Sequence, residues 1–96
     1  METVTLEKAK TYLRIDGNDE DDLILSLIEY SKEEIKNSTG DDGENPSHTY
    51  IMAQLLIITD RYENRGSNDE EFKINNILSR LLTKLKFKVM ANENFS

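Results

Sequence analysis

Apolar residues recur at helical spacing in four segments of the chain, and short polar stretches separate them. The first segment begins after Thr5, which we expect to cap a helix, and it ends at the break IDGN of residues 15–18. The second starts at Asn18 or Asp19 among acidic residues, which favour a helix N-terminus, and Gly40 closes it. Its core side comprises Leu23, Ile24, Leu27, Ile28, Ser31 and Ile35.

The third segment follows a polar loop at residues 41–45. Asn45 and Pro46 resemble an N-cap and a proline at the first helical position. Residues 50–58 are apolar around almost the whole circumference, which is typical of a central, buried helix. We expect this helix to end at Gly66.

The fourth segment follows a capping box, formed either by Ser67 with Glu70 or by Asn68 with Glu71. Its helical stripe consists of Phe72, Ile74, Ile77, Leu78, Leu81, Leu82 and Leu85. Residues 84–89 (KLKFKV) then alternate strictly between charged and apolar, which is the period of a strand. Two interpretations stay open. This stretch is either a strand that needs another subunit's edge, or the end of the helix fraying into a basic tail.

These patterns predict an all-α fold. It is a small bundle of about four helices around a buried third helix, with a possible C-terminal strand or extended tail used in assembly. With 96 residues, the chain is long enough for one domain, which we assign to residues 1–90, followed by a disordered tail at residues 91–96. A core of this size is modest, so contact with a partner surface would add stability.

The formal net charge of −7 argues against free nucleic acid as a ligand, because such binding depends on Lys and Arg that neutralise phosphates. A helix-turn-helix reader is disfavoured for the same reason. The charge is also uneven. Residues 1–79 hold 8 basic and 18 acidic side chains, a balance of −10, whereas residues 80–96 hold 4 basic and 1 acidic, a balance of +3. Opposite charge at the two ends favours head-to-tail contacts between proteins.

No pattern of reactive residues stands out. The chain has no cysteine, and the acidic run at residues 16–22 fails the calcium-loop template, which needs Gly and Glu where Asp21 and Leu27 stand. His48 is the only histidine, and Ser47 beside it forms no catalytic triad by adjacency alone. We therefore expect no catalytic, cofactor or metal site, and no enzyme. The N-terminus also lacks a signal-peptide pattern, and the longest apolar run is too short for a membrane span.

The chain resembles the head–tail connector proteins of tailed phages, also called head-completion or portal-adaptor proteins. The similarity lies in LEKAKTYLRID at residues 6–16, EDDLI at 20–24 and LI at 27–28, followed by Thr39-Gly40, an acidic loop, Pro46, an apolar helix and YENR at 62–65. It covers about residues 3–82. The C-terminal end departs from the family, which often has a proline–glycine element there and finishes near a Tyr-Arg pair.

The resemblance implies a virion structural protein, assembled in the host bacterial cytoplasm. Such proteins form a cyclic homo-oligomer of about a dozen subunits on the portal vertex. The ring extends the DNA channel and receives the next head-completion or tail protein, while DNA passes through without specific binding. The candidate interface with the portal or a neighbouring subunit is the basic end of the chain, comprising Arg80, Lys84, Lys86, Phe87, Lys88 and Val89. The alternative function is a small prophage regulatory or DNA-packaging-associated binding protein.

Overall fold

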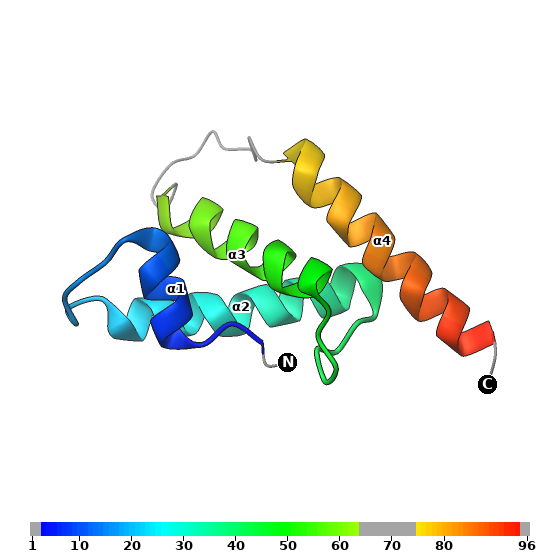
Figure 1. Cartoon of the computed structure of the whole chain (residues 1–96), viewed down its shortest axis with the longest axis horizontal. Coiled ribbons are helices and arrows are strands. Elements are labelled where there is room, and N and C mark those ends of the chain that lie inside the picture. Colours follow the sequence, from blue (N-terminus) through cyan, green and yellow to red (C-terminus); the bar gives the residue numbers. More distant parts are fainter. Residues whose placement is uncertain (1–2, 64–74, 95–96) are drawn as a thin grey trace.

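The computed structural model describes residues 3–63 and 75–94, and within these ranges it is all-helical (Figure 1). The helices are α1 (Leu6–Leu13), α2 (Asp21–Thr39), α3 (His48–Glu63) and α4 (Asn75–Asn94). The predicted all-α fold is confirmed. The expected ends at Gly66 and the capping box of Ser67 or Asn68 lie outside the described residues.

α2 and α3 pack against each other and form the centre of the bundle. α1 packs on both of them at one end, and α4 crosses both at the other end (Figure 1). The third helix is therefore buried among the other three, as predicted. α2 shares that central position, since it too contacts every other described helix.

Two predicted helix ends are confirmed by their hydrogen bonds. Thr5 caps α1, because its side-chain oxygen accepts a hydrogen bond of 3.1 Å from the amide of Lys8. Gly40 ends α2 in the left-handed conformation with φ of 88°, and its amide donates to the carbonyl of Lys36 at 2.8 Å.

Two helix starts lie about two residues later than the sequence pattern predicts. α3 is capped by Ser47 and not by Asn45, since the Ser47 hydroxyl accepts a hydrogen bond of 3.2 Å from the amide of Tyr50. α2 begins at Asp21, and Glu20 just before it makes no side-chain cap; its carboxylate accepts a hydrogen bond from the hydroxyl of Tyr62 on α3.

The apolar core consists of two clusters along the α2–α3 pair. The first joins α1 and the N-terminal segment to the central pair, and its buried members are Val4, Ala9, Ile24, Ile28, Leu55 and Ile58. The second joins α4 to the same pair, and its buried members are Ile35, Tyr50, Ala53, Ile57, Leu78 and Leu85. Half-buried Ile51 packs against both clusters.

A buried polar network links the N-terminal segment to both helices of the central pair. Gln54 of α3 is fully buried; its carbonyl accepts a hydrogen bond of 3.0 Å from the amide of Val4, and its amide donates to the hydroxyl of Ser31 at 2.9 Å. The Ser31 hydroxyl in turn donates to the carbonyl of Ile28 at 2.7 Å. Since buried polar atoms are costly when unpaired, this network ties the N-terminal segment, α2 and α3 in one relative position.

The loop between α2 and α3 folds back over Tyr50. Its polar sequence suggests a solvated loop, but part of it is buried. Asp41 is buried, and its carboxylate accepts a hydrogen bond of 2.9 Å from the amide of Gly43. A Cβ at Gly43 would stand 2.8 Å from Cζ of Tyr50, so only glycine allows this close approach. The loop therefore covers the second cluster at Tyr50.

The first prediction concerns the polar network. Gln54→Leu leaves the amide of Val4 without its acceptor, so we expect it to lower the free energy of unfolding by about 2 kcal/mol in chemical denaturation. Gln54→Leu combined with Ser31→Ala should cost less than the sum of the two single changes, because they share a hydrogen bond. Met52→Ala, at an exposed position of the same helix, is the control and should change stability by no more than about 0.5 kcal/mol. Equal losses at Gln54 and Met52 would contradict a structural role for the network.

The second prediction concerns Tyr50. Burial, followed by the negative charges of Asp41, Asp42 and Glu29, raises the pKa of its hydroxyl to about 12 from the ordinary value of 10.0. As the pH rises, the Tyr50 hydroxyl therefore ionises at a lower pH in the unfolded chain than in the folded chain. Its contribution to stability is complete below about pH 10 and is lost between pH 10 and 12.

Tyr50→Phe should remove that part of the alkaline destabilisation, about 1–3 kcal/mol, when unfolding is compared at pH 9 and pH 11.5. At pH 9 the substitution should cost little, because the Tyr50 hydroxyl has no hydrogen-bond partner among the described residues. Identical pH profiles for the wild type and the variant would refute the assignment.

Candidate assembly surface

α4 packs on α2 and α3 through one face and leaves the rest of its circumference to solvent. Leu78 and Leu85 are buried against the central pair, and Leu81 and Leu82 are half-buried beside them. This i, i+3, i+4, i+7 spacing is a helical stripe, and it explains why the stretch 84–89 is helical. The alternating pattern of that stretch suggested a strand as one possibility, and the structure shows a helix instead.

The helix also extends beyond the boundary that the sequence suggested. α4 continues to Asn94, four residues past position 90, where the domain was expected to end. Residues 91–94, assigned to a disordered tail, are thus helical, and residues 95–96 lie outside the described ranges.

Helical geometry divides the six candidate interface residues into three groups. Arg80, Lys84 and Lys88, spaced four residues apart, follow one exposed face, and Phe87 lies beside them with 63% of its surface exposed. In a strand all three lysines of the stretch would share a face. In a helix, two positions correspond to a rotation of about 200°, so Lys86 lies on the opposite side.

Val89 belongs to the packed side of α4. It is half-buried, and its Cγ1 would be 3.3 Å from a Cβ placed on Gly40. A side chain at position 40 would therefore press on Val89, which would have to shift by a few tenths of an ångström. Val89 thus makes a packing contact within the subunit, and its predicted place in the interface stays a prediction.

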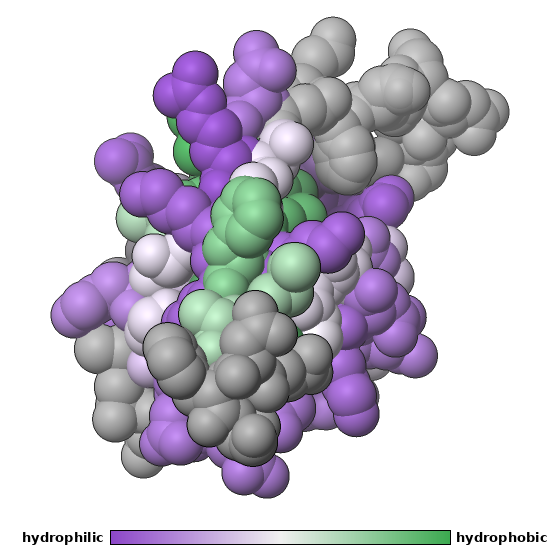
Figure 2. Space-filling model, turned by 90° about the vertical axis from the view of Figure 1, so that its right-hand side faces the viewer, coloured by the Kyte–Doolittle hydropathy of each residue, from purple (hydrophilic) through white to green (hydrophobic). Residues whose placement is uncertain are grey.

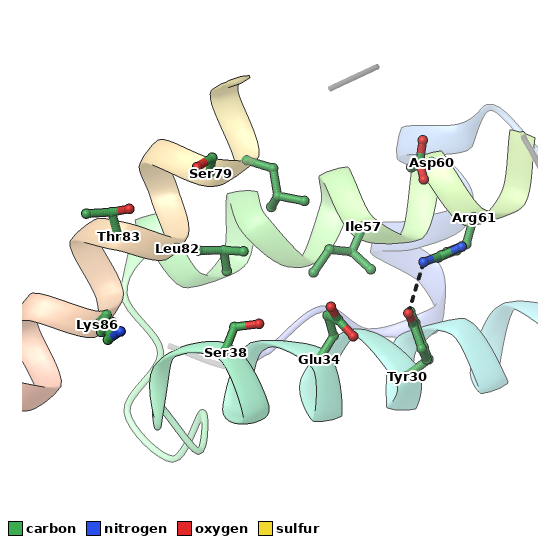
Figure 3. A pocket seen from close by; sticks show the side chains of 11 residues that line it. Tyr30, Glu34, Ser38, Ile57, Asp60, Arg61, Ser79, Leu82, Thr83 and Lys86 are labelled. Carbon is green, nitrogen blue, oxygen red and sulfur yellow. Dashed lines mark hydrogen bonds between the residues drawn. The ribbon is translucent and has the colours of Figure 1, made fainter. Parts of the chain in front are cut away.

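Lys86 contributes to a groove of about 400 Å³ between α2, α3 and α4 (Figure 3). Glu34 and Ser38 of α2 lie across from it, and apolar side chains such as Ile57 form the floor. At the far end, the guanidinium of Arg61 donates a hydrogen bond of 3.2 Å to the hydroxyl of Tyr30 and lies 5.3 Å from the centre of its ring. The groove therefore combines both signs of charge with an apolar floor.

The outer surface carries large apolar side chains that the sequence pattern did not single out. The exposed ones are Tyr12, Leu25, Met52, Ile77, Phe87 and Met90. Seen from the side where α4 ends, a narrow hydrophobic strip runs between hydrophilic side chains (Figure 2). The sequence pattern placed Ile77 in the apolar stripe of the fourth segment, whereas the structure leaves it 59% exposed at the flank of the packed side; Phe87 was named from the sequence as an interface residue.

Neither a metal-ligating cluster nor a helix able to span a membrane occurs among the described residues. Within residues 3–63 and 75–94, no three His, Cys, Asp or Glu side chains gather closely enough to hold a metal ion. None of the helices there has both the length and the hydrophobicity needed to cross a bilayer. His48, the only histidine, is exposed in the first turn of α3, as predicted.

These features define a small helical module with a charged and partly apolar outer surface. Over residues 3–86 the chain matches the family model of phage gp6-like head-tail connector proteins, and it belongs to that family. The family consists of structural phage proteins and is not a known enzyme family. The resemblance noted from the opening helices is thereby confirmed. Neither the curated proteins nor the solved structures give a match.

The third prediction separates the packed face of α4 from its outer face. Leu85→Ala should lower the free energy of unfolding by about 2–5 kcal/mol, because Leu85 is 1% exposed in the second cluster. Phe87→Ala, two residues away, should change stability by about 0.5 kcal/mol or less. Urea denaturation of the dilute chain, followed by circular dichroism, measures both. A large loss at Phe87 would mean that this side chain is packed within the subunit.

Proposed function

We propose that the chain forms a ring of about a dozen subunits on the portal vertex of the phage head. The ring would connect the head to the tail, extend the DNA channel and receive the next head-completion or tail protein. The observation that carries this proposal is the connector-family match over residues 3–86. On this proposal the protein is part of the virion and is assembled in the host bacterial cytoplasm.

The exposed face of α4 supports an assembly role. Ile77 and Phe87 are 59% and 63% exposed, and both lie beside the basic residues Arg80, Lys84 and Lys88. Large apolar side chains rimmed by charges are typical of surfaces that bind other proteins. We propose that this face contacts the portal or a neighbouring subunit.

The charge of the helical body supports passage of DNA without binding. Residues 1–79 have a balance of −10, and phosphate binding needs clustered positive charge that this part of the chain lacks. A ring whose inner surface is formed by such a body would repel the DNA backbone, so that DNA slides through the channel.

The fourth prediction tests the ring. The purified chain is mixed with assembled portal and examined by native mass spectrometry and negative-stain imaging. We expect about a dozen copies of the chain per portal, arranged as a continuous ring. A strict monomer or dimer, both alone and with portal, would contradict the proposal and favour a small regulatory binding protein. The portal must be present, because a weak contact between subunits can need a template to reach the required local concentration.

A further inference from the structure

The outward side of α4 forms one continuous basic and apolar surface. We call it the α4 face and define it as Ile77, Arg80, Lys84, Phe87 and Lys88, which are all exposed. Their spacing of three and four residues aligns them along one side of the helix. The only acidic residue in the sequence of α4 is Glu93 near its C-terminal end, so no acidic residue of this helix lies among the three positive charges of the face.

α2 carries a surface with an acidic excess, in which Lys32 and Lys36 each follow an acidic residue by three positions. We call it the α2 face and define it as Asp22, Leu25, Glu29 and Glu33, which are all exposed on the side of α2 away from its buried stripe. Leu25, at the centre of this face, is 46% exposed. At the edge of the face, Lys32 pairs with Glu29 at 3.4 Å, a solvent-exposed ion pair of small energy that a better-placed cation can replace.

Within one subunit these two faces cannot meet. The buried side of α4, with Leu78 and Leu85, packs against the central pair, so the α4 face points outward. The buried side of α2, with Ile24, Ile28 and Ile35, likewise faces the core, and the α2 face is on its opposite side. Any contact between the faces must therefore form between two copies of the chain.

The two faces also match in length and in the order of their side chains. The stretch from Leu25 to Glu33 and the stretch from Arg80 to Lys88 each rise roughly 12 Å along their helix. When the helices are laid antiparallel, Lys84 stands opposite Glu29 and Arg80 opposite Glu33. The same register brings Phe87 and Lys88 to Leu25 at one end of the contact, beyond the Lys84–Glu29 pair, and brings Ile77 to Lys36 at the other end.

We infer that the α4 face of one copy docks on the α2 face of the next copy, and that this contact joins neighbouring subunits of the ring. The inference rests on the proposed function and specifies the interface within it. Because the two faces differ, the contact is heterologous and can repeat around a closed ring. Its charged pairs are exposed, so assembly should weaken as the salt concentration rises.

The fifth prediction uses two charge-reversed chains. Variant A carries Arg80→Glu and Lys84→Glu, and variant B carries Glu29→Lys and Glu33→Lys. In each variant alone, the two faces have the same sign, so assembly on portal should weaken by roughly tenfold or more. In an equimolar mixture, the acidic α4 face of A meets the basic α2 face of B, and the unaltered faces also match. The mixture should therefore recover ring formation with alternating subunits, which native mass spectrometry detects by mass.

The control variant reverses two exposed charges outside both faces, Lys8→Glu and Glu44→Lys, and should assemble like the wild type. Circular dichroism checks that all variants keep their helices. Normal assembly of A or B alone, or failure of the mixture while each variant stays folded, would overturn the inferred contact. So would a variant A that forms free rings but no longer binds portal, because the α4 face would then belong to the portal. Failure of the wild type to form any ring on portal would instead overturn the proposed function.

Discussion

The arrangement of this chain depends on the buried hydrogen bonds of Gln54. This side chain lies between the two apolar clusters, where it binds the amide of Val4 and the hydroxyl of Ser31. Apolar side chains can repack, so they specify the register of α2 and α3 less strictly than a hydrogen bond does. A slide between these helices would break the hydrogen bond from Gln54 to Ser31 and leave the side-chain amide unpaired in the core, at a cost of about 1–3 kcal/mol. The network thus selects one register of the central pair, on which both α1 and α4 are placed.

The helical pattern predicted the fold well because the apolar stripes are long and regular. The ends were predicted where a single residue decides them, as with Thr5 and Gly40. They were missed where two residues compete: Asn45 and Ser47 are both good caps, and the chain uses the one whose hydroxyl reaches the amide of Tyr50. Gln54 gave no signal in a helix that is otherwise apolar, since its two partners are distant in sequence and only the fold brings them together.

The candidate interface shows the same limit more sharply. A six-residue alternation in residues 84–89 suggested one surface of lysines, but helix formation is decided over a longer stretch. Leu78 and Leu85 keep α4 on the central pair, and this fixes which positions face outward. Lys84 and Lys88 consequently join Arg80, whereas Lys86 turns toward the groove and Val89 toward Gly40. The types of residue were readable from the sequence, but their division between surface and core required the helix to be placed.

α4 has a packed side and an outer side, and their relative orientation affects how a ring could close. If the α4 face of one subunit docks on the α2 face of the next, as inferred, the angle between successive subunits follows from the angle between these two faces within each subunit. That internal angle is held by the second cluster and by the packing of Val89 close to Gly40. A small tilt of α4 would be repeated at every contact around the ring, so that it would fail to close or would change its number of subunits. In the inferred ring, core packing in the second cluster would therefore govern the geometry of assembly as well as the stability of the subunit.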